Sequence, residues 1–250
     1  MAGKLGKLAP QFDARDLPLR ALLKPVIAFP SNYDFDALHP ELPYPMFAND
    51  TLGCCVISGR AHQTLRFEDI EQKKVIPITD QEVIKEYYRQ TGGIDSGLVV
   101  SRSLRSWRQK GWIAAAQRYY AKGYARINHK VLDEVRTGIY ADVGVGIGFS
   151  VPQYAMEQID RGLDWTIPIN RTPAGDQIVG GHYVLLVAYG SDGTFTCVTW
   201  GQRQKMSAAF FTEYCDEGWA VFDAANPTAK QLNLIDFAKM DSFVDALKVA

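Results

Sequence analysis

Before residue 165, hydrophobic positions recur mainly with the period of helices. Residues 52–68 predict a helix whose apolar positions are Val56, Ile57, Ala61 and Leu65. The stretch "TDQE" at 79–82 has the form of a capping box, and it predicts a helix that continues to about Gln90. Further helices are expected over 100–110, where Gly111 follows, and over 128–138, with Asn128 as the N-cap and Gly138 at the end.

The pattern changes to that of strands in the second part of the chain. "DVGVGIGFSV" at 142–151 alternates in the manner of a strand, and its glycines indicate close backbone approach. "HYVLLVAYG" and "GTFTCVTWG" are apolar strand runs joined at 190–193 by Gly-Ser-Asp-Gly, which predicts a hairpin. A short helix is expected in "SAAFFTEYC" and another strand in "GWAVFD". Helices first and antiparallel strands later predict an α+β fold.

The first 45 residues have a different composition, because they contain seven of the twelve prolines. Proline lacks a backbone donor and restrains its neighbour, so we expect an extended arm laid over the body. Its expected anchors are Phe12, Phe29, Tyr33 and Phe35. The predicted division is therefore an arm over 1–45, a helical lobe over 46–165, a β lobe over 166–235 and a helical tail over 236–250.

Composition narrows the function classes. The 27 basic and 28 acidic residues give no general argument for binding nucleic acid or membranes. No apolar run reaches the ~18 residues of a membrane helix, and the beginning of the sequence lacks the apolar stretch of a secretory signal. Four cysteines, two of them adjacent, do not suggest a disulfide framework. We therefore expect a reduced, cytoplasmic protein without a membrane partner.

The adjacent cysteines of "NDTLGCC" stand at the start of the first predicted helix. The helix dipole and free N–H groups at such a position stabilise a thiolate, so Cys54 or Cys55 is a candidate nucleophile. The bland alternative is a pair of small apolar residues that enter a core. The decision between them depends on "GGHYVLLVAYG" and "CVTWG", more than a hundred residues downstream.

Three short motifs in order carry a resemblance to a known family. Asn49 lies six residues and Gly53 two residues before Cys55, and Trp200 follows His182 by eighteen. The sequence thereby resembles the papain-like cysteine peptidases, most of all a divergent bacterial and phage branch of that fold. The resemblance covers about residues 46–222. It implies a two-lobe fold in which the cysteine helix of a helical lobe packs on an antiparallel β lobe that carries the histidine.

The resemblance also implies roles for individual residues. Cys55 takes the position of the nucleophile, His182 that of the general base, and Asn49 that of the side-chain donor to the oxyanion. Trp200 takes the position that shields the histidine from water. Each has a structural alternative: a small residue in a core, a histidine beside glycines, a turn residue and a core aromatic at a strand end.

One position departs from the family pattern. The family places a histidine-orienting asparagine two residues before the tryptophan, where this chain has Val198. Thr199 and Gln202 are the nearest polar candidates, but strand alternation directs Thr199 away from the face of Val198. A Cys–His dyad without the third group can still react, since that group contributes less than the nucleophile or base. Weak turnover is the expected consequence.

Residues 96–132 hold eight basic and no acidic side chains, with aromatic residues interleaved. This combination is found in surfaces that bind single-stranded nucleic acid or an acidic partner, but a solvated helix face with inward-packed aromatics is the preferred interpretation. His62 lies on nearly the same helical face as Cys55, and we expect it to pack rather than react. Neither Cys197 nor Cys215 has metal-ligand spacing, and no cofactor is expected.

Two functions from different classes follow. The first is a papain-like thiol hydrolase that cleaves a peptide or isopeptide-type amide through a Cys55 thioester, with transfer to an amine as a variant. The second is a catalytically silent papain-fold interaction protein, such as a phage virion component. Val198 and the proline-rich arm favour the second function, since an extended arm suits docking on a neighbouring subunit. The arm could equally resemble a propeptide or strap the lobes together.

Overall fold

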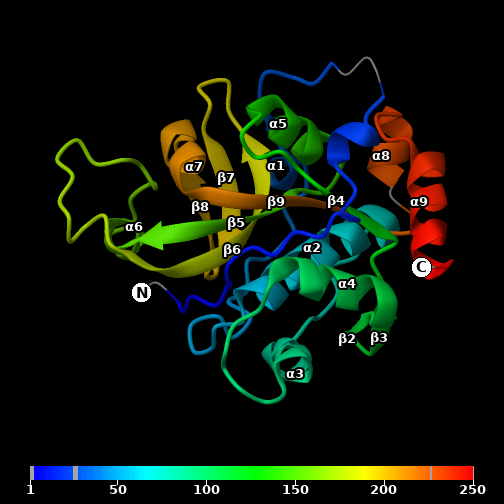
Figure 1. Cartoon of the computed structure of the whole chain (residues 1–250), viewed down its shortest axis with the longest axis horizontal. Coiled ribbons are helices and arrows are strands. Elements are labelled where there is room, and N and C mark those ends of the chain that lie inside the picture. The colour runs from blue at the N-terminus through cyan, green and yellow to red at the C-terminus, as the bar shows by residue number, and fades with distance from the viewer. Residues whose placement is uncertain (1–2, 25–27, 226, 250) are drawn as a thin grey trace.

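The computed structural model describes residues 3–24, 28–225 and 227–249 (Figure 1). Its helices, beginning with one 3-10 turn, are η1 Leu19–Ala21, α1 Phe35–Leu38, α2 Cys55–Gln72, α3 Asp80–Thr91, α4 Val100–Lys110, α5 Leu132–Ala141, α6 Gln153–Asp160, α7 Ala208–Tyr214, α8 Pro227–Leu232 and α9 Phe237–Val249. Its strands are β1 Tyr33–Asp34, β2 Trp112–Ala114, β3 Gln117–Tyr119, β4 Gly123–Arg126, β5 Val145–Pro152, β6 Ile178–Tyr189, β7 Phe195–Thr199, β8 Gln202–Met206 and β9 Cys215–Phe222.

The main sheet is antiparallel and confirms the predicted α+β class. Its strands follow the order β4-β9-β5-β6-β7-β8, and the short strand β1 pairs with the C-terminal end of β6, at Ala188 and Tyr189. The long strand β6 is central, because it pairs with both β5 and β7. The hairpin between β6 and β7 turns through Gly190–Gly193, as the sequence predicts.

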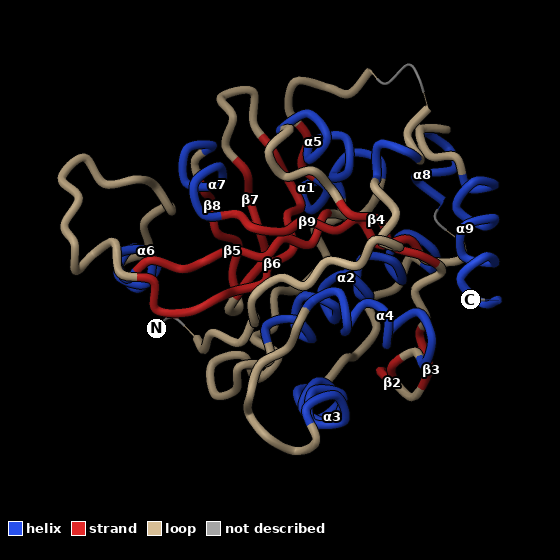
Figure 2. The backbone as a smooth tube through the Cα atoms, viewed as in Figure 1, coloured by secondary structure: helices blue, strands red, loops and turns tan. Residues whose placement is uncertain are grey.

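Helices lie on both sides of this sheet (Figure 2), and a hydrophobic cluster fills the space on each side. One cluster joins α2, α3 and α4 to the sheet through residues such as Ile57 and Tyr183. The other contains side chains from α5, α6 and α7 and includes Phe149 and Trp200. The alternation of side chains along β6 therefore sends successive residues to different clusters, and the register of this strand decides which of them faces α2.

The helix predicted over 52–68 is present, but α2 begins three residues later, at Cys55, and ends four residues later, at Gln72. Helix α4 ends at Lys110 before Gly111, as expected. The capping box is present: the Thr79 side chain accepts from the Glu82 backbone, and the Glu82 side chain accepts from the Thr79 backbone. Such reciprocal bonds satisfy N–H groups that a helix start leaves without partners.

The predicted limits of α5 are wrong. This helix begins at Leu132 without a side-chain cap, because Asn128 uses its side chain to accept from the Lys130 N–H within the preceding turn. Gly138 lies inside the helix and does not end it. A Cβ there would lie 2.8 Å from the Val145 side chain, so this glycine allows close packing of α5 on β5.

The N-terminal arm is largely irregular, as the prolines predict. Of its expected anchors, Phe35 is buried, and Phe29 and Tyr33 pack against the hydrophobic core. Phe12 is 50% exposed, although its ring lies 6.4 Å from that of Trp219. A polar attachment adds to these: Arg66 of α2 donates to both carboxylate oxygens of Asp36 at 2.9 and 2.6 Å. Both side chains of this pair are completely buried.

The main sheet also takes β4 and β5 from the range 46–165, which the sequence assigned to the helical lobe. The division into lobes at residue 165 therefore stays a prediction, and the structure shows that strands are not confined to the later part. Helix α9 lies within the range 236–250 that was predicted as a helical tail. Among the described residues, none of the helices is both long and apolar enough to cross a membrane.

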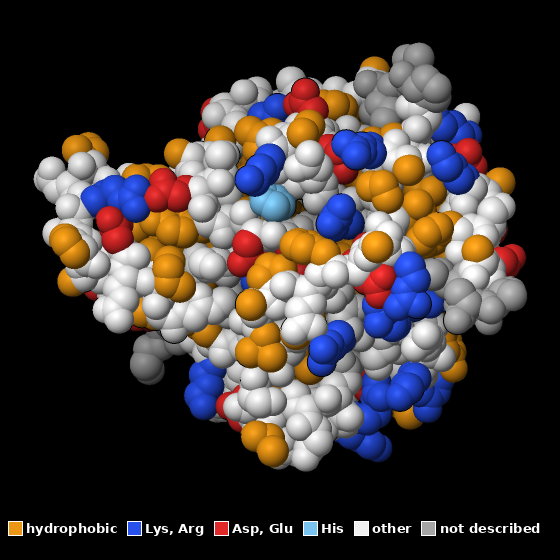
Figure 3. Space-filling view, in the orientation of Figure 1, with side chains coloured by type: hydrophobic (Ala, Val, Ile, Leu, Met, Phe, Trp, Pro, Cys, Tyr) orange, Lys and Arg blue, Asp and Glu red, His pale blue; other side chains and the backbone are white. Residues whose placement is uncertain are grey.

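Lys and Arg side chains gather over α4 and the β2–β3 hairpin, on the face shown in Figure 3. Arg105 and Arg108 of the basic stretch 96–132 lie here, next to Arg15 of the arm. The two tryptophans of this stretch, Trp107 and Trp112, are buried, with 2% and 1% exposure, and so cannot stack on bases. This placement favours the interpretation as a solvated face with aromatic residues packed inward.

Candidate active site

Cys55 is the first residue of α2, and Cys54 is its N-cap. Both thiols are buried. Burial raises the pKa of Cys55 to about 12, although backbone hydrogen bonds from Tyr183 and Gly6 act in the opposite direction. Burial likewise raises the pKa of Cys54 to about 11. The Cys54 thiol donates to the Phe47 carbonyl and lies beside the Ser58 hydroxyl, so it packs between the turn before α2 and the helix itself.

His182 stands on β6, opposite Phe149 of β5. Its ring stacks on Trp200 with centroids 4.1 Å apart and an interplanar angle of 20°. Its Nε2 lies 2.6 Å from the Thr199 hydroxyl oxygen. Its Nδ1 is buried and has no hydrogen-bond partner among the described residues. Burial alone lowers the pKa of His182 to about 3, so the imidazole is neutral in this conformation.

A small enclosed space connects the neighbourhoods of these two residues. It is about 10 Å³ in volume, and its lining includes Cys55, Tyr183, Thr199 and Trp200. Thr199 and Trp200 touch the ring of His182, and Tyr183 is its neighbour along β6. No hydrogen bond joins the thiol and the imidazole among the described residues. Successive residues of a strand point to opposite faces, so Tyr183 packs with Cys55 in one hydrophobic cluster, whereas the His182 ring lies against Phe149 and Trp200 of the other. Both the thiol and the imidazole are uncharged in this conformation.

Thr199 occupies the place beside His182 that the sequence left without a polar group. Val198 pairs with Leu185 and packs in a small cluster with Leu185 and Val187, away from the imidazole. The next residue along β7 points the other way, so Thr199 reaches His182. The sequence correctly predicted that Val198 and Thr199 point to opposite faces of β7. It was wrong in placing His182 on the face of Val198, because His182 contacts Thr199. Gln202 is exposed at the start of β8 and does not reach the ring.

Trp200 and Gly201 form the turn after β7, with φ of 44° and 75°. A tryptophan in the left-handed region is strained, and this conformation places its indole flat on His182. Trp200 is 6% exposed and covers one face of the imidazole. That it keeps water from the ring, as the resemblance implied, stays a prediction.

Asn49 lies in the turn before α2 and is buried. Its side-chain amide donates to the backbone carbonyls of Lys4 and Leu52, at 3.0 and 2.9 Å. The donor that the resemblance assigned to an oxyanion therefore already binds a carbonyl oxygen, and that oxygen comes from the beginning of this chain.

The residues Gly3–Leu8, which we call the covering segment, lie over the candidate site. Gly6 and Lys7 donate their N–H groups to the Gly181 carbonyl, next to His182. On the other side, Leu98 donates to the Gly6 carbonyl and accepts from Leu8. In Figure 1 this blue stretch passes between the sheet and the lower helices.

Gly53 explains how the covering segment approaches so closely. A Cβ on Gly6 would lie 1.7 Å from the Gly53 carbonyl oxygen, and one on Gly53 would lie 2.9 Å from the Leu5 carbonyl. The Gly53 N–H is held by the Asp95 carboxylate, 2.9 Å away. Two glycines face each other here because side chains would separate the segment from the body.

Sequence reasoning missed the covering segment, Leu98, Gly181 and Asp95. The covering segment has two glycines within six residues, yet nothing in its sequence says which surface it contacts. His62 also lines the small space beside Cys55, but its ring packs on Phe47 with centroids 4.9 Å apart. Burial lowers its pKa well below the usual value, which fits the predicted packing role.

The mixed fold of helices and an antiparallel sheet is that of the papain-like cysteine proteases. Solved structures of that fold are similar to this chain. Xylellain, a cysteine protease from Xylella fastidiosa, has a TM-score of 0.67 and 18% identity, over 88% of this chain and 96% of its own.

Two further structures extend the likeness. ProCathepsin B S9 from Trypanosoma congolense has a TM-score of 0.61 and 12% identity, over 88% of this chain and 86% of its own. The Carica candamarcensis cysteine protease CMS1MS2, in complex with E-64, has a TM-score of 0.57 and 15% identity, over 78% and 99%. No family model and no curated protein matches the sequence. These likenesses show the fold.

Proposed function

We propose that this chain is a thiol hydrolase that cleaves a peptide or isopeptide-type amide through a thioester on Cys55. The observation that carries the proposal is the setting of His182. One ring nitrogen is held by Thr199, the ring face is covered by Trp200, and the other nitrogen has no partner among the described residues. An imidazole used only for packing would more often have both nitrogens satisfied.

The mechanism begins with the imidazole tautomer. When Nε2–H donates to the Thr199 hydroxyl, Nδ1 has the lone pair. It accepts the thiol proton of Cys55 once opening of the site brings the two side chains within hydrogen-bond reach. The thiolate attacks the amide carbonyl, and a C–S bond forms. The imidazolium gives its proton to the leaving amine as the C–N bond breaks. Water then attacks the thioester, gives a proton to His182, and releases the acid and the thiol.

The oxyanion of each tetrahedral intermediate needs donors in fixed positions. Asn49 and the backbone N–H of Cys55 are the donors we propose. Asn49 supports this role by its present hydrogen bond, since its amide already binds the carbonyl oxygen of Lys4. The bond also means that a substrate carbonyl must displace the covering segment first. The site is therefore closed in the conformation that the structure shows.

A catalytically silent interaction protein is the second candidate, and a specific observation favours it. Cys55 has a raised pKa of about 12 and His182 a lowered pKa of about 3, so the closed site contains a neutral thiol and a neutral imidazole. A permanent covering segment would keep it in that state. The arm could then serve in protein assembly, as the sequence suggested.

Single-turnover acylation by a peptide ester distinguishes the two candidates. The wild-type chain, Cys55→Ala and Cys54→Ala are compared, with ester cleavage and a mass increase on the peptide that contains Cys55 as readouts. We expect acylation of the wild type and of Cys54→Ala, but not of Cys55→Ala. Equal background rates in all three, together with an unmodified Cys55 when the covering segment has been displaced by mutation, would favour the silent protein.

A further inference from the structure

The side chain of Lys7 is buried in the sheet side of the candidate site. Lys7 is the residue of the covering segment that follows Gly6, and Gly6 reaches the Cys55 thiol through its backbone. The Lys7 side chain is only 2% exposed, which is rare for lysine unless it is paired. The fold therefore contains a pocket that a lysine side chain fills almost completely.

The end of this pocket is acidic. The Lys7 ammonium lies 2.8 Å from an Asp216 carboxylate oxygen and 3.4 Å from one of Glu217. The Glu217 side chain is fully buried, and its other oxygen accepts from the indole N–H of Trp219 at 2.8 Å. Trp219 thus fixes the carboxylate that faces the ammonium, whereas Asp216 is 28% exposed toward solvent.

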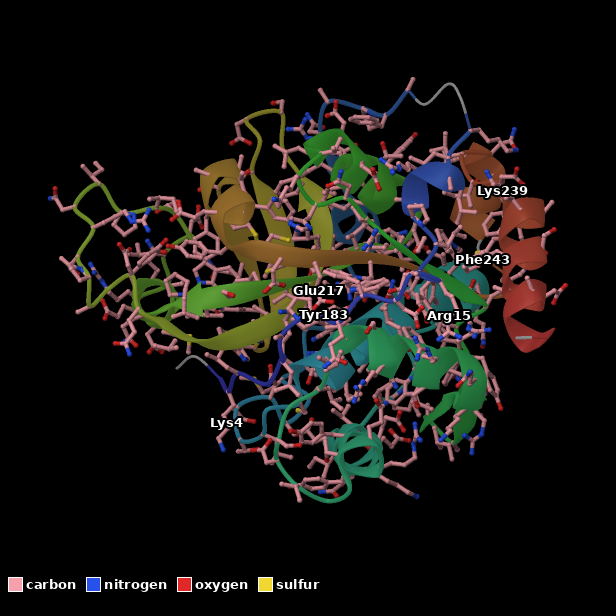
Figure 4. All side chains as sticks on the ribbon, viewed as in Figure 1. Lys4, Arg15, Tyr183, Glu217, Lys239 and Phe243 are labelled. Carbon is pink, nitrogen blue, oxygen red and sulfur yellow. The ribbon has the colours of Figure 1, made fainter. Side chains whose placement is uncertain are left out.

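The stem of the lysine lies over a backbone that has no side chain at that point. A Cβ on Gly148 of β5 would lie 2.1 Å from the Lys7 Cε and 2.7 Å from the Glu217 Cγ. Gly148 pairs with Tyr183 of β6 on one side and with Glu217 of β9 on the other, and these two side chains lie close together in Figure 4. The wall of the pocket is thus formed by sheet residues and not by the covering segment itself.

We propose that the pocket ending at Asp216 and Glu217 recognises a lysine-type side chain of the substrate, and that Lys7 occupies it in the closed state. This inference rests on the proposed function, because it concerns the amide that Cys55 attacks. The substrate class is a peptide with an unmodified lysine one residue from the residue placed over the thiol. A buried carboxylate with one oxygen held by Trp219 discriminates strongly against a neutral side chain, since the charge would be left without a partner.

The first test does not depend on catalysis. Lys7→Ala in the full chain removes three methylenes and the ammonium, and n-propylammonium has the same size and charge. At pH 8 we expect n-propylammonium chloride to raise the Tm of Lys7→Ala by several degrees, and 1-propanol or sodium chloride at equal concentration to raise it much less. Lys7→Met is the matched control, since methionine fills the pocket without a charge and should give no response.

The second variant, Lys7→Ala/Glu217→Gln, keeps the cavity but removes the buried charge. We expect it to lose the response to n-propylammonium. Equal stabilisation by n-propylammonium and 1-propanol in Lys7→Ala, or a response that survives Glu217→Gln, would overturn the inference. If Lys7→Ala does not fold, refolding in n-propylammonium or 1-propanol gives the same comparison: recovery with the ammonium alone supports the inference, and recovery with both or with neither overturns it.

The third test uses activity. Lys7→Ala is given a set of peptides in which lysine is the only charged side chain and its position moves along the sequence. A second set has norleucine in place of lysine. We expect cleavage at one fixed offset from lysine, with kcat/KM at least about tenfold above norleucine, and loss of this preference in Lys7→Ala/Glu217→Gln. Cleavage without preference overturns the inference alone. If no peptide is cleaved but n-propylammonium still raises the Tm of Lys7→Ala, the proposed function is overturned and the lysine pocket is retained.

Discussion

The hydroxyl of Thr199 lies 2.6 Å from Nε2 of His182, between the end of β7 and the middle of β6. Both residues are buried, with 4% and 0% exposure, so solvent cannot replace this bond directly. A buried bond to one ring nitrogen fixes the ring plane, and the hydroxyl can accept from Nε2–H, which leaves the lone pair on Nδ1. Thr199 is thus the positioning residue for the proposed base, one position later in the chain than the family pattern places it.

Replacement of Thr199 tests that role. Thr199→Val has nearly the same shape but no hydroxyl, and we expect turnover to fall about 10²-fold or more because the imidazole loses its orientation. It should also lose about 1–3 kcal/mol of stability, since Nε2 is left unsatisfied. Thr199→Ser is the matched control and should retain most of the activity. An active Thr199→Val with an unchanged pH profile would contradict the assignment.

Val198→Asn should not repair the departure from the family pattern. Val198 packs with Leu185 and Val187 in a cluster on the face opposite to Thr199, so an amide there does not reach the imidazole. We expect no gain in acylation rate and a loss of roughly 1–3 kcal/mol from the buried polar group. Urea unfolding and the acylation assay measure both effects. A faster reaction in Val198→Asn would mean that the two strands shift register when the site opens.

The covering segment controls access to Cys55, and Gly6→Val tests it. The added side chain cannot fit against the Gly53 carbonyl, which a Cβ would approach to 1.7 Å. We expect Gly6→Val to displace the segment and to increase alkylation of Cys55 by iodoacetamide, with Cys54 unchanged because it is buried behind Phe47. Peptide mass spectrometry between pH 5 and 9 separates the two thiols.

The alkylation rate of Cys55 should depend on pH differently in the wild type and in Gly6→Val. In the wild type, the pKa of Cys55 is raised to about 12, so the thiolate fraction and the alkylation rate should rise steadily through pH 9. In Gly6→Val, water and a charged His182 should lower that pKa, and the rate should level off within the range. Ala174→Val, an added bulk on an exposed loop, is the control and should behave as the wild type. Equal rates for both cysteines in Gly6→Val would contradict a specific role of the segment.

The parts of this structure that were predictable are those that local pattern determines. The capping box at Thr79 and the hairpin at Gly190–Gly193 depend on residues a few positions apart, and both were found from sequence. Cys55 was placed at the helix start by the same local reasoning. The contact between His182 and Thr199 was not predicted. It depends on the register between β6 and β7, which shifts between Leu186 and Ala188.

Long-range contacts of the arm could not be predicted for a related reason. Lys7 meets Asp216 and Glu217 across more than two hundred residues of sequence, and Arg66 meets Asp36 across thirty. Charged residues are usually solvated, so a sequence gives no sign that these will be buried and paired. Both ion pairs come together only when the chain folds.

The buried pair of Arg66 and Asp36 should fix the arm to α2. Arg66→Met alone leaves the Asp36 charge buried without a partner, and we expect a loss of about 3–5 kcal/mol. Arg66→Met/Asp36→Leu removes both charges and should recover most of this loss. Urea unfolding of the wild type, both single variants and the double variant measures the coupling. Additive losses would show that the two residues act independently.

His182 should make the protein less stable as the pH falls. Its pKa is lowered from 6.5 to about 3 in the folded chain, so the unfolded chain takes up a proton first. The stability that the neutral imidazole contributes is fully present above pH 6.5 and is lost progressively as the pH falls toward 3. At about 1.4 kcal/mol for each pKa unit, the largest loss is on the order of 5 kcal/mol.

His182→Leu keeps the stack on Trp200 approximately filled and removes the titration. We expect its free energy of unfolding to change less steeply between pH 6.5 and 4 than that of the wild type, whatever its absolute stability. Some slope should remain in His182→Leu, since His62 is also buried with a pKa well below the usual value. His62→Leu should therefore flatten the curve further in the double variant. Identical slopes in the wild type and His182→Leu would mean that water reaches the imidazole, and that the covering segment opens often enough in solution to let it titrate normally.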